Sequence, residues 1–202
     1  MRTMRHQGFT LIELMIGLAI FAFLILIAGP MYADFLGNSQ IRNGAENTLT
    51  GVRLAQTEAI RGNLQGKFVL DPTQGTGGWK VWRYNDGDGI AGDASCPATG
   101  APQWCLVQSY GWADGAAKTK ADPTPSAATT ILFNGLGQIA SKDLVTDASP
   151  TIITQIDVTN TNVPTVSRRP LRIVVSTAGG TSGTKLCDPA VTDTTDPRFC
   201  PT

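Results

Sequence analysis

The sequence predicts an α+β fold, in which one long N-terminal helix packs on a C-terminal antiparallel β domain with disulfide-closed loops. Three observations lead to this prediction. A stretch without charge runs from Leu14 to Tyr32, and apolar residues at helical spacing follow it to about residue 61. Beyond Asn63 the chain changes to short apolar runs separated by Gly, Thr, Asp and Pro, which is typical of strands joined by turns.

Length and composition place the chain among globular proteins. Its 202 residues suffice for one domain and an appendage, and 42% of them are hydrophobic against 16% charged. The formal net charge is zero, and without Arg2 and Arg5 the 16 basic residues fall to 14 against 16 acidic ones. The net charge therefore gives no reason to expect nucleic acid or an anionic membrane surface as a partner.

The apolar segment begins at Phe9 and is interrupted once, by Glu13. From Leu14 it is long enough to cross a bilayer, which takes roughly 20 residues. Basic residues precede it and none follows directly, so we expect a single pass with the N-terminus in the cytoplasm and the body in the periplasm. A secretory signal peptide or a plain signal anchor would explain the hydrophobicity, but neither explains Gly8 before the run or Glu13 inside it.

Glu13 is the feature of this segment that calls for a function. A carboxylate at membrane depth is costly without a partner. A cut after Gly8 would give Phe9 a free ammonium four residues before Glu13. Between neighbouring helices of a bundle, these two charges would set the axial register, because a misaligned neighbour would leave the carboxylate unpaired.

The residues around this junction resemble the class III signal of type IV pilins and type II secretion pseudopilins. The resemblance implies that a prepilin peptidase cuts between Gly8 and Phe9 and methylates Phe9, and that Glu13 supports subunit registration. Pro30 stands where the family commonly has a proline. The matching run is Gly8-Phe9-Thr10-Leu11-Ile12-Glu13-Leu14-Met15.

One helix is predicted from about Phe9 to about Arg61, on the order of 80 Å long at 1.5 Å per residue. Pro30 is expected to break it by interrupting its hydrogen bonding. In the second half an apolar stripe should dock on a sheet, with charged side chains opposite, and Gly62-Asn63 supplies a stop signal. The stripe comprises Ile41, Ala45, Leu49, Val52, Ala55 and Ala59, and the charged face Arg42, Glu46, Arg53, Glu58 and Arg61.

The C-terminal part is expected to form strands at 67–70, 79–84, 106–110, 130–133, 151–158, 171–176 and about 184–187. Alternation predicts that Ile152, Thr154, Ile156 and Val158 share one face. The segment 113–128 consists mainly of Ala, Lys, Asp, Pro and Thr and is predicted to be an exposed loop or insertion.

Further fragments resemble the GspH/FimT branch of the pilin family, a group of minor pilins and minor pseudopilins. They occur in the family's order, although each is less specific than the N-terminal motif. The fragments are 52–61, the run Gly78-Trp79-Lys80-Val81-Trp82, 131–139, and 172–176 with 185–200.

Four cysteines permit three pairings, and their spacing, with His6 as the only histidine, argues against a zinc site. We favour the local disulfides Cys96–Cys105 and Cys187–Cys200, because each closes a short loop in a turn-rich segment. Such bridges require an oxidising compartment, here the periplasm or cell surface. The C-terminal pair also resembles a disulfide loop of minor pilins in this branch, which favours a pilus over a secretion system.

An acidic, Gly-rich turn is a weak calcium candidate through Asp86, Asp88 and Asp93. Ile90 stands where an EF-hand has an oxygen ligand and no Glu closes the loop, so an ordinary hairpin turn is the simpler interpretation. No metal or cofactor is therefore expected.

The basic cluster Arg168, Arg169 and Arg172 is a candidate DNA contact. DNA-binding members of the branch resemble one another in a Gly-Arg-x-Arg element, and the corresponding stretch 178–185 has no Arg. A solvated strand face is the simpler interpretation, and DNA is not expected as a partner.

The sequence thus predicts an assembly function and no enzyme, since the only histidine lies in residues 1–8. We expect a structural minor pilin of a type IV pilus, with an H-type minor pseudopilin of a type II secretion system and a DNA-binding minor pilin for natural transformation as alternatives. The expected partners are other pilins, the prepilin peptidase and the inner membrane, before transfer to a pilus or pseudopilus. The expected division is a leader peptide at 1–8, a hydrophobic helix at 9–36, an amphipathic helix at 37–62 and a periplasmic β-rich domain at 63–202.

Overall fold

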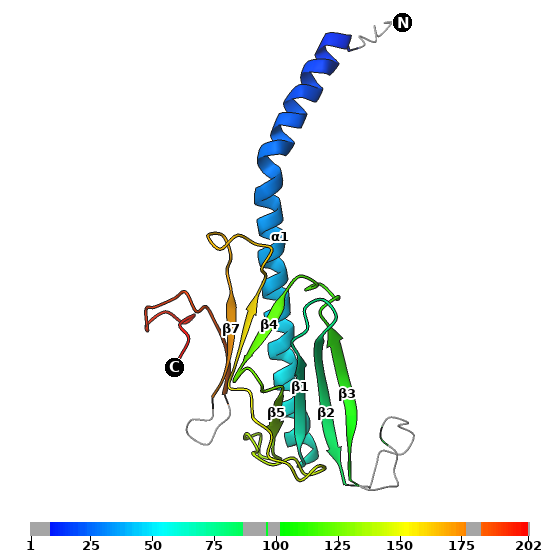
Figure 1. The fold of residues 1–202 in the computed structure, drawn as a ribbon, viewed down its shortest axis with the longest axis vertical. Coiled ribbons are helices and arrows are strands. Elements are labelled where there is room, and N and C mark those ends of the chain that lie inside the picture. The colour runs from blue at the N-terminus through cyan, green and yellow to red at the C-terminus, as the bar shows by residue number, and fades with distance from the viewer. Residues whose placement is uncertain (1–8, 87–95, 97–101, 177–182, 202) are drawn as a thin grey trace, which may run out of the picture.

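The computed structural model describes residues 9–86, 96, 102–176 and 183–201. Within these residues a single long helix, α1 (Leu11–Gly62), lies along two four-stranded sheets, and its N-terminal part stands clear of them (Figure 1). This arrangement confirms the predicted α+β architecture. Three residues of the predicted sites, Gly8, Asp88 and Asp93, lie outside the described residues.

Both sheets are antiparallel throughout. The first has the strand order β3-β2-β1-β5 and the second the order β4-β6-β7-β8. Most of the expected strands are found within a few residues of their predicted ends. The strands are β1 (Gly66–Asp71), β2 (Gly78–Asn85), β3 (Gln103–Gly111), β4 (Lys120–Thr124), β5 (Thr130–Phe133), β6 (Gln155–Thr159), β7 (Leu171–Ser176) and β8 (Gly183–Cys187).

The prediction of an exposed loop at 113–128 is wrong. Strand β4 lies within it, and Ala116, Ala121 and Ala128 are buried in the core. Alanines carry too little apolar surface to reveal an alternating pattern, and Pro123 argues against a central strand. The structure reconciles these facts because β4 is an edge strand of its sheet, where a residue without an N–H is tolerated.

The predicted strand at 151–158 is also divided. Its first part crosses from one sheet to the other, since the N–H of Ile153 donates to Thr130 O and that of Thr154 to Thr124 O. Ile153 is buried, as are Ile156 and Val158, so the inward-facing positions change parity along this run. The face predicted through Ile152 and Thr154 therefore does not continue into β6.

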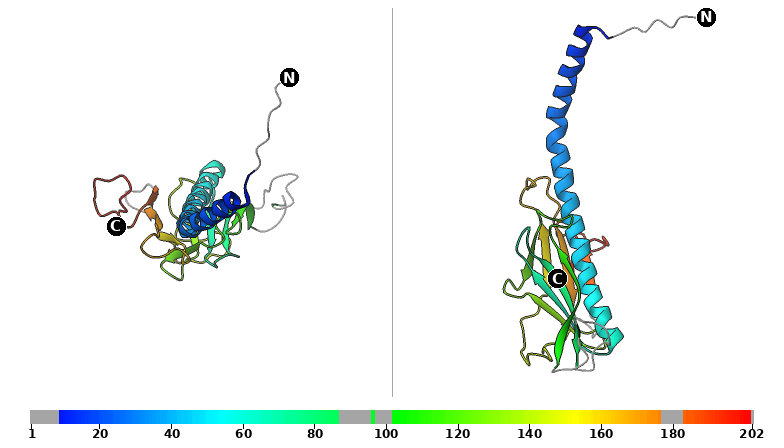
Figure 2. Two further views of the ribbon diagram at one scale, coloured as in Figure 1. Left: turned by 90° about the horizontal axis from the view of Figure 1, so that it is seen from above. Right: turned by 90° about the vertical axis from the view of Figure 1, so that its right-hand side faces the viewer.

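Helix α1 begins and ends at clear caps. Thr10 is extended and its hydroxyl accepts from Glu13 N, while Asn63 adopts a left-handed conformation whose N–H reaches the last carbonyls. The helix continues through Pro30 in place of the predicted break. A proline inside a helix removes one donor and favours bending, and α1 curves gently where it leaves the body (Figures 1 and 2).

The second half of α1 forms one wall of the core. The predicted stripe is buried against both sheets, from Ile41 to Ala59. Gly51 permits close packing, because a Cβ there would lie 2.8 Å from the Trp79 ring. Glu58, expected on the exposed face, is buried and pairs with Arg61 and Arg83. The charged face is thus narrower than the spacing predicted.

Candidate assembly site on the exposed helix

The first half of α1 presents apolar side chains to its surroundings. The described side chains of residues 9–33 are all exposed, including Phe9 at 86%. By length and composition α1 is long and apolar enough to cross a membrane. A soluble protein rarely exposes so large an apolar surface, so this half of the helix needs a lipid bilayer or other subunits around it.

Glu13 is the only charged residue between Phe9 and Ala33. It occupies the first turn of α1, where its backbone N–H donates to Thr10 Oγ1 at 3.3 Å. The helix dipole stabilises a carboxylate there by about 0.3–1 kcal/mol, which is less than the several kcal/mol that an unpaired charge enclosed among apolar helices costs. A positive partner is still required, and no Lys, Arg or His lies between Phe9 and Ile41.

The surface beside Glu13 is hollowed. Phe9, Glu13, Leu14, Gly17 and Leu18 line an open groove along the first two turns. At Gly17 an added Cβ would find nothing within 4 Å, so this position leaves a notch rather than a packed contact. The surface beside the carboxylate is therefore open.

Just beyond the apolar half of α1, the body contacts the helix through hydrogen bonds that could not be predicted from the sequence. Ser167 Oγ donates to Asp34 Oδ2 at 2.7 Å, and Asn38 bonds to Ser167 O and to the Arg169 N–H, each at 2.9 Å. A side chain at Gly37 would overlap Val163. We call residues 160–170, which join β6 to β7, the collar loop.

The two disulfides have the predicted local pairing. Cys96 bonds to Cys105 and Cys187 to Cys200, with Cα atoms 5.1 Å apart in both. Cys187 ends β8, so the second bridge fixes the C-terminal segment to the edge of the second sheet. That segment carries Arg198, which pairs with Asp196 at 2.8 Å and holds the pKa of Asp196 down to about 2.

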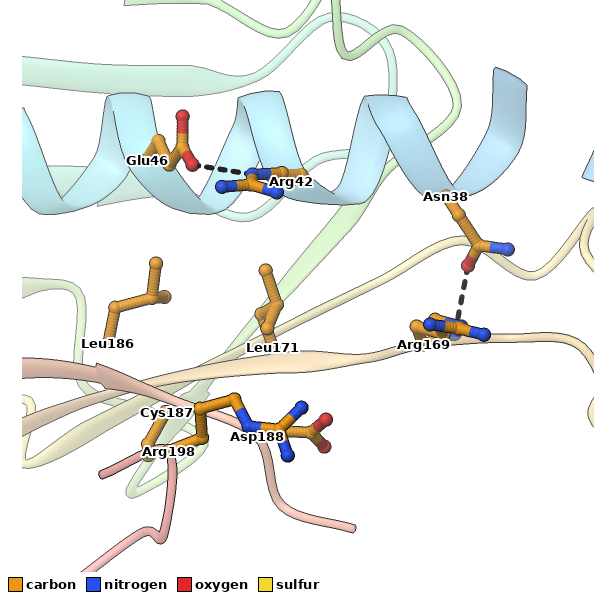
Figure 3. Close-up of a pocket in the computed structure, with 9 residues that line it drawn as sticks. All are labelled: Asn38, Arg42, Glu46, Arg169, Leu171, Leu186, Cys187, Asp188 and Arg198. Atoms are coloured by element: carbon orange, nitrogen blue, oxygen red, sulfur yellow. Dashed lines mark hydrogen bonds and ion pairs between the residues drawn. The ribbon is translucent and has the colours of Figure 1, made fainter. Parts of the chain in front are cut away.

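A groove of about 320 Å³ separates α1 from β7, β8 and the C-terminal loop (Figure 3). On its helical wall, Arg42 pairs with Glu46 across one helical turn. The groove is open and combines an apolar floor, Leu171 and Leu186, with a polar rim. None of these groups forms a nucleophile with an adjacent base.

The candidate DNA contacts are mostly engaged within the body. Arg172 makes a two-pronged ion pair with Asp157, at 2.7 and 3.1 Å. Arg168 donates to Val163 O through two nitrogens, at 3.0 and 2.8 Å. Arg169 is exposed and lies beside Asn38, and among the described residues its guanidinium has no ion pair (Figure 3).

The calcium candidate gains no support from the part of the chain that the structure describes. Asp86 directly follows β2, while Asp88 and Asp93 are outside that part. No group of three His, Cys, Asp or Glu side chains that could hold a metal occurs among residues 9–86, 96, 102–176 and 183–201.

A buried polar cluster stabilises the base of the body. Lys67 donates to Asp143 at 3.2 Å and lies over the Trp104 ring, whose Nε1 also donates to Asp143. Burial lowers the pKa of Lys67, and Asp143 opposes this only in part. Burial alone would raise the pKa of Asp143, but backbone N–H groups of Thr146 and Val145 and the Lys67 amine outweigh it and leave this pKa below its usual value.

An exposed apolar helix with one carboxylate in its first turn, carried on an antiparallel β body, defines a type IV pilin-like protein. Residues 3–29 match the family described as "Prokaryotic N-terminal methylation motif", and residues 44–179 match "Type II transport protein GspH". The chain belongs to the GspH family. These matches confirm the resemblance seen in the N-terminal run and in the scattered fragments.

The chain is similar to fimbrial proteins of Dichelobacter nodosus. A "Fimbrial protein" is 36% identical over 111 residues, and a "Type IV major fimbrial protein FimA" is 36% identical over 113 residues. Each alignment covers 52% of this chain and 68% of the relative. Among solved structures, the type IV minor pilin FimU of Pseudomonas aeruginosa aligns with a TM-score of 0.43 and 16% identity, over 75% of this chain and 91% of that chain.

Proposed function

We propose that this protein is a structural minor pilin of a type IV pilus, held in the inner membrane by α1 as a precursor. A prepilin peptidase cuts it between Gly8 and Phe9 and methylates Phe9, and the mature subunit joins or primes a fibre. The observation that carries the proposal is Glu13, a lone carboxylate on an exposed apolar helix. Its partner must come from another molecule or from the cut itself.

The assembly step follows from that charge. After the cut, the Phe9 ammonium of one subunit pairs with Glu13 of its neighbour inside a bundle of apolar helices. Removing one member of a buried ion pair costs about 3–5 kcal/mol, because the other charge stays buried without a partner. Only one axial register satisfies both charges, so the pair selects the correct alignment among many apolar ones.

Processing is tested directly on the purified protein. Mass spectrometry of the mature chain should find Phe9 as the first residue, with the mass of one added methyl group. The substitution Gly8→Asp, which places a charge at the cleavage position, should leave the precursor uncut in the membrane. An uncut wild-type chain in cells that contain the peptidase would overturn the processing step.

A deletion strain separates the pilus from a secretion system. The fimbrial names of the relatives favour the pilus, whereas the description of the matched GspH family favours a minor pseudopilin. Loss of surface fibres with normal export of secreted enzymes would support the pilus. Retained fibres with secreted enzymes trapped in the periplasm would support the H-type pseudopilin.

DNA uptake remains the third candidate, and Arg169 is the residue that favours it. A gel shift of the full chain in detergent at moderate salt tests it, with Arg168→Ala/Arg169→Ala as the comparison. Binding that is lost in this variant would support a DNA-binding minor pilin. The proposed structural subunit has no catalytic step of its own, since the prepilin peptidase both cuts and methylates the chain.

A further inference from the structure

The collar loop lies at the end of the body nearest the exposed half of α1 (Figure 1). The second view agrees, with this loop beside the point where the helix leaves the sheets (Figure 2). Asn160 anchors one end of the loop, through bonds to Gly37 O and Gln40 Oε1 at 3.5 and 3.4 Å. Ser167 anchors the other end, through its bond to Asp34. Both ends of the loop are therefore bonded to α1, which fixes the position of the loop along the helix axis.

The position of the loop relative to the bilayer follows from the spacing of two charged residues in the helix. Glu13 and Asp34 are the first two charged residues of the described helix, and only uncharged residues lie between them. At 1.5 Å per residue they are about 32 Å apart along the axis, whereas the hydrocarbon core of a bilayer is about 30 Å thick. With Glu13 at one edge of this core, Asp34 lies at the other edge. The collar loop, bonded to Asp34, then lies among the lipid headgroups.

The loop presents groups suited to that layer. Val166, in a turn of the loop, is 99% exposed, and two arginines follow it, Arg168 and Arg169. Within the described residues neither arginine has an ion pair with a carboxylate, since Asp34 bonds to Ser167 instead. Exposed aromatic side chains, Tyr32 and Phe35, lie at the same level of the helix. Aromatic residues and cations are the groups that anchor proteins at membrane interfaces.

We propose that the collar loop is a membrane contact that holds the waiting subunit upright on the periplasmic leaflet. Val166 enters the boundary between headgroups and acyl chains, and the exposed side chain of Arg169 meets the phosphates of anionic phospholipids, while Arg168 holds the loop through its bonds to Val163 O. The proposal rests on the proposed function, because it requires α1 to be inserted as an anchor. The zero net charge of the chain does not oppose it, because the attraction of each cation to an anionic surface is local.

The depth of three labelled positions tests this contact and the anchor separately. The full chain carries one added cysteine at a time, Leu24→Cys, Val166→Cys or Leu136→Cys, and the four native cysteines stay in their disulfides. Each variant is spin-labelled in nanodiscs of phosphatidylglycerol and phosphatidylcholine. The ratio of collision rates with oxygen and with a soluble nickel chelate measures depth. Leu136 is the matched control, an exposed apolar side chain in a turn packed near Ile60, at the far end of the body.

We expect Leu24 to report the hydrocarbon core, Val166 a ratio several-fold above that of Leu136, and Leu136 bulk water. A deep Leu24 with Val166 as accessible to nickel as Leu136 would overturn the collar contact and leave the anchor intact. A Leu24 label in water would instead overturn the anchor on which both proposals depend.

Substitutions at Arg169 test the electrostatic part of the proposed membrane contact. Arg169 suits this test because only its backbone N–H supports the loop, whereas the guanidinium of Arg168 holds loop carbonyls. Arg169→Gln should lower the Val166 ratio about as much as replacing the lipid by phosphatidylcholine alone, and Arg169→Lys should retain it. An unchanged ratio in Arg169→Gln and in both lipids would overturn the assignment to anionic headgroups.

Discussion

The two halves of α1 are continuous in backbone and opposite in surroundings. Residues 11–33 expose apolar side chains on every side of the helix, whereas from Gly37 to Ala59 one apolar stripe is buried against two sheets. Apolar composition alone therefore does not locate the core of this protein. The half with more apolar residues contributes nothing to the body and depends on lipid or on other subunits.

The two halves of α1 also differ in the partners of their acidic side chains. Glu58 is buried in the second half, but Arg61 and Arg83 of the same chain pair with it. For Glu13 in the first half, the sequence supplies no Lys, Arg or His between Phe9 and Ile41. A buried acid with internal partners contributes to folding, whereas an acid without them makes the chain dependent on a neighbour. Under the proposed function, the first half therefore serves assembly and the second half serves stability.

The largest expected effect is on assembly, in Glu13→Gln. Loss of the charge leaves a neighbour's ammonium unpaired at about 3–5 kcal/mol, which is roughly a hundredfold or more in incorporation. Cleavage before Phe9 and the melting temperature of the body should not change. Quantitative immunoblotting of sheared fibres measures incorporation.

Glu13→Val is the comparison for that variant. Valine removes the polar side chain as well as the charge and keeps the backbone N–H that donates to Thr10 Oγ1, so similar defects in both variants would assign the effect to charge. Normal incorporation of Glu13→Gln would contradict the register mechanism and leave the cleavage site unaffected.

The next largest effect is on stability and distinguishes two isoleucines of the same helix. Ile41→Ala removes a fully buried side chain from the core and should lower the free energy of unfolding by about 2–5 kcal/mol. Ile20→Ala removes a side chain that is 56% exposed and should change it by less than about 0.5 kcal/mol. Thermal unfolding followed by near-UV circular dichroism in detergent measures both. Equal losses would mean that the first half packs on the body.

A smaller effect compares two glycines. Gly37→Ala places a methyl group against Val163 and should destabilise the body by about 1–3 kcal/mol, because the collar loop must shift. At Gly29 an added Cβ meets nothing within 4 Å, so Gly29→Ala should leave the body unchanged and raise the helix propensity by up to about 1 kcal/mol. The same melting measurement applies. A neutral Gly37→Ala would show that the collar is looser than its contacts indicate.

Local patterns explain what could be predicted here. The stripe from Ile41 to Ala59 repeats at helical spacing, and β7 is rich in β-branched residues, so both were found from the sequence. Strand β4 lacks such a pattern, since Ala121 and Pro123 take its inward positions. The collar joins residues that are 133 positions apart, Asp34 and Ser167, and the Lys67–Asp143 pair spans 76. Spacing within one segment carries no information about such pairs, so they required the structure.

The smallest effect concerns acid and acts on the body alone. Because the folded pKa of Asp143 lies below its usual value, its contribution to stability is fully present above the unfolded pKa of about 3.9 and is lost as pH falls through the folded pKa. Lys67 stays charged throughout this range and does not offset the loss. Asp143→Asn should therefore be less stable than wild type at pH 6, with a difference that narrows below pH 4. Urea unfolding at several pH values measures it. A difference that stays constant down to pH 2 would mean that the carboxylate's charge contributes nothing, and that the cluster with Trp104 holds by shape and neutral hydrogen bonds alone.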